Sequence, residues 1–155
     1  MTTVLNSGYH LSPTHTTYPS KQANSRNVFI RRMEGKDTDY IMYLPLYDGI
    51  KTLSIGVDSG AVIKAPINNV LLPSDQRKPI VVYGTSVTQG GCASRPGLVY
   101  TSVLGRKMNR EFINLGFSGN GRMDKIMADK IATIDASAYV IDCLGNCNYN
   151  IIKWS

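Results

Sequence analysis

The sequence predicts an α/β protein in which a three-stranded parallel sheet with crossover helices follows a small antiparallel β unit. Between residues 26 and 74, short apolar runs alternate with turn residues without a helical period, which is typical of antiparallel strands. From residue 75 onward, strand-like runs alternate with segments of helical apolar spacing, which is typical of a parallel sheet. The chain is therefore expected to comprise a leader at 1–25, a β domain at 26–74 and an α/β domain at 75–155.

The first two segments are read from their composition. The leader is rich in Ser, Thr, Asn and Pro, which predicts irregular structure. Four strand-like runs follow it, at residues 27–32, 40–47, 52–57 and 61–67. Turn residues separate these runs, as they do between antiparallel strands. Pro45 interrupts the second run and places it at a sheet edge or a bulge, because proline cannot donate to a strand ladder.

The α/β domain is predicted to alternate strands with helices. The strands are expected at residues 80–84, 111–116 and 138–145, and the helices at 97–109 and 122–134. Pro96 stands where the first turn of a helix tolerates proline. This order implies parallel strands joined by crossovers. Loops then begin at Gly84, Gly116 and Asp142 on one sheet edge, where the sites of open α/β sheets form.

Composition and charge limit the classes of function. The 155-residue chain is 43% hydrophobic and 18% charged, which suits a globular protein with a core. No apolar run approaches the roughly 18 residues of a membrane helix. The N-terminus has no signal-peptide pattern, and the compartment stays open. The formal net charge is +6, but acidic residues interrupt or flank the basic clusters, so nucleic acid is not an expected partner.

The cysteines predict neither a disulfide framework nor a metal site. Cys92, Cys143 and Cys147 are odd in number, and three residues separate the last two, which does not fit a CxxC motif. A zinc site would need further ligands, and His10 and His15 lie far away in the leader. We expect the cysteines to be small core or turn residues, and we expect no cofactor.

Three residues in the predicted loops suit acyl transfer. Ser86 follows the strand at 80–84 and can act as a nucleophile. The backbone N–H groups of Ser86 and Gly119 and the side-chain amide of Asn146 can donate to an oxyanion. Taken singly, each is also an ordinary turn residue. Their convergence in one cleft follows if the first parallel strand lies between the other two, as in a flavodoxin-like sheet.

These loops resemble the first three sequence blocks of the SGNH (GDSL-like) hydrolases. The residues concerned are "GTSVTQGG" at 84–91, "NLGFSGNG" at 114–121 and "LGN" at 144–146. The resemblance implies a three-layer αβα fold, an ester substrate that is a small molecule or a carbohydrate, and no cofactor. It implies Ser86 as nucleophile and Gly119 and Asn146 as oxyanion donors. The preceding β domain resembles an accessory domain found in some bacterial members.

The sequence departs from the family at three points. Thr85 stands where aspartate usually precedes the serine, and Cys147 stands where aspartate often follows the asparagine. The family's last block, Asp-x-x-His, supplies the general base, and no such motif occurs here, nor any histidine after His15. The chain is therefore expected to be truncated before that block and to be a poor catalyst, because a serine without a base is a weak nucleophile.

A dinucleotide site is the alternative enzymatic interpretation. Gly116, Gly119 and Gly121 follow a strand and precede a helix. Asp142 ends the next strand, at the separation along the sequence from Gly121 that is typical of the acid that binds a ribose hydroxyl. Their order is GxxGxG rather than GxGxxG, and they follow the second strand rather than the first. This alternative also leaves the 84–91 loop unexplained.

A non-enzymatic module is the third interpretation. Tyr40, Tyr43 and Tyr47 alternate with apolar residues in the β domain and could bind a carbohydrate or a protein, although packing is the more usual role of such residues. A parallel sheet that ends at its third strand would also expose an edge, which makes a homo-oligomer a candidate assembly.

Overall fold

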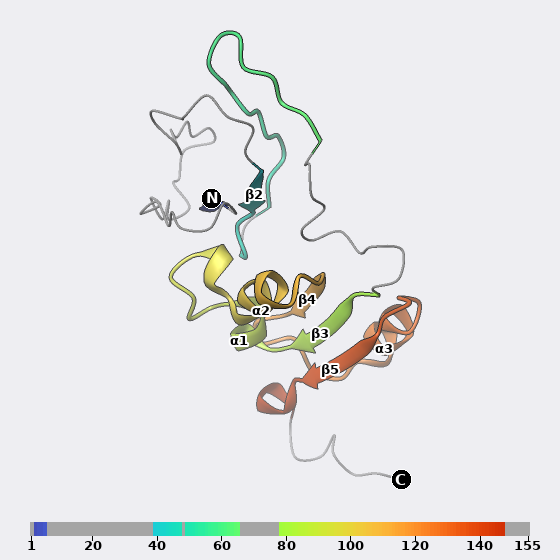
Figure 1. Cartoon of the computed structure of the whole chain (residues 1–155). Coiled ribbons are helices and arrows are strands. Elements are labelled where there is room, and N and C mark those ends of the chain that lie inside the picture. The colour runs from blue at the N-terminus through green and yellow to red at the C-terminus, as the bar shows by residue number, and fades with distance from the viewer. Residues whose placement is uncertain (1, 6–38, 48, 66–77, 148–155) are drawn as a thin grey trace. The chain divides into compact units, whose positions relative to one another are not determined.

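The computed structural model describes residues 2–5, 39–47, 49–65 and 78–147 (Figure 1). They belong to two compact units, one formed by residues 1–68 with 95–97 and the other by residues 69–94 with 98–155. The expected boundary between residues 74 and 75 lies outside the described residues and stays a prediction. No helix in the described ranges is long and apolar enough to cross a membrane.

The first unit contains one antiparallel pair of strands. Strand β1 (Thr2–Leu5) pairs with β2 (Tyr40–Tyr43), so that Thr2 lies opposite Tyr43 and Leu5 opposite Tyr40. Antiparallel pairing was expected for β2, but its partner comes from the leader, so an irregular leader is wrong for residues 2–5. Pairing with another strand satisfies the backbone groups of this short segment, and composition alone does not reveal such a partner.

Two further strands expected in this unit are not present in the residues that the structure describes. Residues 52–57 and 61–65 have no strand structure, and every described residue from 49 to 65 is exposed. Their apolar side chains therefore have no buried surface against which an alternating strand pattern could pack. A turn at Asp58 is present, in which Ala61 N–H donates to the Asp58 carbonyl at 3.0 Å. The expected strand at 27–32 lies outside the described residues.

The second unit contains the predicted parallel sheet. Strands β3 (Ile80–Gly84), β4 (Phe112–Gly116) and β5 (Ala138–Asp142) run in the order β4-β3-β5, with both neighbours parallel to β3 (Figure 1). Strand β3, the first of these three strands along the chain, is therefore the central one, which is the position from which convergence of the three loops follows. Its residues Val81, Val82 and Tyr83 are buried, whereas all of β5 is exposed at the sheet edge.

The helices are shorter than the periodicity predicts. The elements are α1 (Ser86–Gln89), η1 (Pro96–Leu98), α2 (Tyr100–Met108), α3 (Lys125–Ile131) and η2 (Leu144–Asn146). Pro96 opens a separate 3₁₀ turn rather than α2 itself. Helix α3 begins after Met123, whose φ of +62° is incompatible with a right-handed helix. The N–H groups of Arg122 and Met123 donate instead to the Tyr83 hydroxyl, at 3.1 and 3.2 Å.

A cluster of buried apolar residues lies between the sheet and α3. Val81 and Tyr83 from β3 pack with Ile131 from α3 and with Cys143. Partly buried apolar side chains surround them, among them Ile113, Leu115, Met127 and Ile134. Alternate residues of β3 and β4 thus face α3, as the two-residue period of a strand requires.

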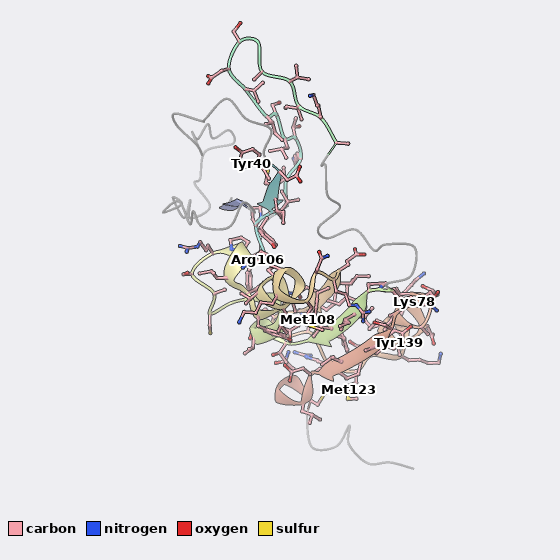
Figure 2. The ribbon with its side chains drawn as sticks, viewed as in Figure 1. Tyr40, Lys78, Arg106, Met108, Met123 and Tyr139 are labelled. Carbon is pink, nitrogen blue, oxygen red and sulfur yellow. The ribbon has the colours of Figure 1, made fainter. Side chains whose placement is uncertain are left out.

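The amino ends of β3 and β5 are joined by an exposed ion pair. Lys78 Nζ lies 2.7 Å from Asp135 Oδ1, and the hydrogen bond to Asp135 raises the pKa of Lys78. Figure 2 shows Lys78 beside Tyr139 of β5 at this side of the sheet. Because both charged groups are well exposed, solvent screens their attraction and the pair contributes little stability.

Candidate functional site

The three loops singled out from the sequence all leave the sheet at the carboxyl ends of its strands. Gly84, the last residue of β3, lies in register with Gly116 of β4 on one side and with Asp142 of β5 on the other. Each strand therefore ends at the same level, and the segments that carry Ser86, Gly119 and Asn146 begin side by side. The strand order and register bring the candidate residues to one edge of the sheet.

Ser86 is the first residue of α1, which starts directly after the central strand. Thr85 caps the helix in an extended conformation, and its Oγ1 accepts a 3.4 Å hydrogen bond from Val87 N–H. Gly90 ends the helix with φ of +106°. This tight strand-to-helix turn holds Ser86 half-buried just beyond the carboxyl end of the central strand.

Glycines allow these loops to approach closely. A Cβ added to Gly84 would lie 2.1 Å from Thr88 Oγ1, and one added to Gly116 would lie 2.0 Å from Gln89 N. A Cβ on Gly121 would lie 2.2 Å from the Gly84 carbonyl oxygen and 3.4 Å from Thr85 N. The turn after β4 therefore packs directly against the segment that precedes Ser86.

A polar network holds α1 on the sheet. Thr88 is fully buried, and its hydroxyl accepts from Tyr100 at 3.2 Å and donates to Asp142 Oδ2 at 3.4 Å. Asn114 Nδ2 donates to the Thr88 carbonyl at 2.7 Å and to Thr101 Oγ1 at 3.0 Å. Because buried polar groups are costly when unpaired, these bonds fix the position of the helix that begins at Ser86.

Replacing Asn114 with leucine is expected to destabilise the protein by about 1–3 kcal/mol. The change leaves the Thr88 carbonyl without its amide donor and deprives Gly116 N–H of the Asn114 Oδ1 that it contacts at 2.9 Å. Urea denaturation would measure the loss, with Asn120→Ala as an exposed control that should change stability by less than about 0.5 kcal/mol. Equal stabilities of the two variants would contradict this assignment.

Gly119 lies in the turn that follows β4. Its φ of +71° favours glycine, and a Cβ there would meet no atom within 4 Å. Phe117 N–H donates to the Gly84 carbonyl at 2.9 Å, and Ser118 N–H donates to Gln89 Oε1 at 2.7 Å. Both bonds tie the Gly119 turn to the segment from Gly84 to Gln89, which contains Ser86.

Asn146 ends η2, the turn after β5. Its Nδ2 lies 3.5 Å from the Phe117 carbonyl oxygen, so the third loop reaches the turn that carries Gly119. Cys143 beneath it is fully buried, and burial raises the pKa of its thiol. Cys147 Sγ lies 3.3 Å from the Cys143 carbonyl oxygen. Both cysteines thus support the turn, while Cys92 is exposed, and none of the three is in a disulfide.

Three of the four residues in the dinucleotide alternative hold the sheet and α1 together. Gly116 and Gly121 lie against the backbones of Gln89 and Gly84, and Asp142 accepts a hydrogen bond from the buried Thr88. In the described ranges, no group of three or more His, Cys, Asp or Glu side chains could hold a metal ion. His10 and His15 lie outside those ranges.

Sequence reasoning did not identify several residues that organise this edge. Asn114 could have been found, because a polar residue inside the apolar run "FINLG" signals a buried hydrogen bond. Gln89 carries no such signal, since its partner Ser118 lies on a loop 29 residues away. Arg122 carries none either, because a surface arginine gives no sign that its side chain bonds the Gly119 carbonyl.

Comparisons with known proteins agree with this arrangement. Residues 77–154 match the GDSL-like lipase/acylhydrolase family model, and residues 7–63 match a model described as the N-terminus of SGNH-hydrolase-type esterases. The crystal structure of a candidate GDSL-like lipase from Bacteroides ovatus is similar, with 47% sequence identity and a TM-score of 0.63. The match covers 70% of this chain but 31% of that one, so this chain spans under a third of its length. A search among curated proteins gave no match.

Proposed function

Because the chain belongs to the GDSL-like lipase/acylhydrolase family, we propose that it carries the nucleophile and oxyanion donors of a serine ester hydrolase. Ser86 is the nucleophile in this proposal. Its own N–H, the N–H of Gly119 and the side-chain amide of Asn146 are the donors. The substrate is an ester of a small molecule or a carbohydrate.

The mechanism follows from the chemistry of acyl transfer. Ser86 Oγ attacks the ester carbonyl while a general base takes the hydroxyl proton, and the tetrahedral intermediate that forms carries a negative charge on the former carbonyl oxygen. Donors fixed in advance stabilise that charge without having to reorganise during the reaction. Collapse of the intermediate expels the alcohol and leaves an acyl-serine, which water then hydrolyses.

The register of the sheet is the observation that supports this proposal most strongly. The segments that carry Ser86, Gly119 and Asn146 begin next to one another at the carboxyl ends of the strands, which supports a shared site. Hydrogen bonds from Ser118 N–H to Gln89 and from Asn146 to Phe117 connect the segments. A rigid frame of this kind suits a site in which donor positions determine the rate.

The α/β domain contains no histidine that could act as the general base. The only histidines in the sequence are His10 and His15, both within its first 25 residues. The 155-residue chain by itself should therefore hydrolyse esters very slowly, since general-base help is worth about 10²- to 10⁴-fold in rate.

Rescue by an external base tests the proposal on the chain as it stands. Hydrolysis of p-nitrophenyl acetate would be followed as imidazole is added, in parallel for the native chain and for Ser86→Ala. Imidazole by itself hydrolyses this ester in solution, so the informative quantity is the difference in hydrolysis rate between the native chain and Ser86→Ala. The proposal expects a difference that grows with imidazole, together with acetylation at Ser86 detected by mass spectrometry. Identical rates and no acetyl-Ser86 would refute it.

A further inference from the structure

Arg122 is the cation closest in sequence to the proposed oxyanion donor Gly119. Its Nε donates to the Gly119 carbonyl oxygen at 2.8 Å, and its backbone N–H donates to the Tyr83 hydroxyl at 3.1 Å. A residue's own N and O atoms are about 3 Å apart, so Arg122 Nε lies within about 6 Å of Gly119 N. The guanidinium is thus fixed beside the position where the ester oxygen would bind.

The two terminal nitrogens of Arg122 have no protein partner in the described part of the chain, where its hydrogen bonds are those to Gly119 and Tyr83. Asp124, two residues further on, makes no ion pair with it there. Arginine presents its terminal nitrogens as a planar fork that matches a carboxylate. Arg122 is exposed, so a ligand can reach this fork.

The turn beneath Arg122 is held at several points. Phe117 is bonded to Gly84, Ser118 to Gln89 and Met123 to Tyr83. The guanidinium is therefore presented from a fixed backbone, which lowers the entropy cost of binding a ligand. The formal net charge of +6 additionally favours the approach of anions to the chain.

We propose that Arg122 is a substrate-specificity residue that binds a carboxylate carried by the ester substrate close to its scissile carbonyl. This inference rests on the proposed function, because it takes the Ser86–Gly119 site as the place of the ester. The preferred substrates are then monoanionic esters rather than their neutral counterparts. Arg122 binds and orients the substrate and takes no part in proton transfer.

Ligand binding tests this without depending on turnover. The full chain would be titrated by ¹H–¹⁵N NMR with monomethyl succinate and with the neutral dimethyl succinate. We expect the monoanion to bind about 5-fold more tightly, a preference that added salt should reduce. Arg122→Gln should remove the preference, and Arg122→Lys should keep part of it, since lysine retains the charge without the fork.

Arg110→Gln is the matched control. Arg110 Nη1 donates to Ser137 Oγ at 3.0 Å, just before β4 and β5 at the amino ends of the strands, so its loss removes the same charge away from the candidate site. This variant should keep the full preference.

Equal affinities, an unchanged preference in Arg122→Gln or no saturable binding would each overturn the assignment. Ser86→Ala should leave the preference intact. A failure of the proposed nucleophile would instead appear as imidazole-dependent hydrolysis that is equal in the native chain and in Ser86→Ala, with no acetyl-Ser86, while the Arg122-dependent preference is still present.

Discussion

Joining a C-terminal segment that carries an Asp-x-x-His block to this chain is expected to raise ester hydrolysis by about 10²- to 10⁴-fold. The physical reason is that the hydroxyl of Ser86 is a weak nucleophile until a positioned base removes its proton. The family resemblance assigns that role to this block. The gain would be measured as kcat/KM for p-nitrophenyl acetate.

Ser86→Ala in the extended chain is expected to abolish that gain. A second control replaces the added histidine with alanine and should return the rate to that of the 155-residue chain. The reason is that removing one member of a catalytic unit costs about as much rate as removing all of them. Efficient Ser86-dependent turnover by the unextended chain would contradict the account. It would show that another group, such as His10, His15 or a residue of a second copy, supplies the base.

Gly116→Ala is expected to cost about 3 kcal/mol of folding stability, or to prevent folding of the α/β unit. The added Cβ would lie 2.0 Å from Gln89 N, 2.5 Å from Gln89 Cα and 2.6 Å from the Thr88 carbonyl carbon. All three atoms belong to the backbone, so no side-chain rotation relieves the overlap. Either α1 moves away from β4, or the end of the strand distorts.

Two glycine variants serve as controls for this effect. A Cβ on Gly145 would meet no atom within 4 Å, so Gly145→Ala should change the free energy of unfolding by less than about 0.5 kcal/mol. Gly119→Ala also meets open space but adopts φ of +71°, and should cost about 1 kcal/mol through backbone strain. Urea denaturation of the three variants would rank them, and a Gly116→Ala protein as stable as Gly145→Ala would contradict the packing described.

The parallel sheet could be predicted from sequence because its signals are local and strong. The apolar run of β3 reflects burial of Val81, Val82 and Tyr83, and the alternation of strands with helices limits how the chain can connect them. The helix ends could not be predicted equally well. Helix α3 starts late because the Tyr83 hydroxyl, forty residues earlier in sequence, binds the N–H of Met123.

The β unit shows the opposite case, in which a local pattern misleads. Residues 52–57 and 61–65 have strand-like composition, yet all are exposed and none is in a strand. Strand β1 instead comes from residues whose composition suggested an irregular leader. Strand formation depends on the pairing partner more than on propensity, and the partner is a long-range property.

The sequence alone was enough to name the residues of the candidate site, but not the contacts between them. Ser86, Gly119 and Asn146 stand out because each follows a predicted strand. The contacts that hold their segments together, such as Ser118 N–H with Gln89 Oε1, follow only from the strand order. No local pattern reveals them, because the two residues lie on different loops.

The effect of Asn146→Ala on the extended chain tests the central claim most directly, namely that Ser86, Gly119 and Asn146 act on one ester. Loss of a single oxyanion donor typically lowers kcat by about 10²- to 10³-fold. We predict a fall of that size with KM changed by less than about 3-fold, because the charge that Asn146 stabilises develops only in the transition state. A kcat equal to that of the parent, in a variant with unchanged unfolding free energy, would show that Asn146 does not share a site with Ser86.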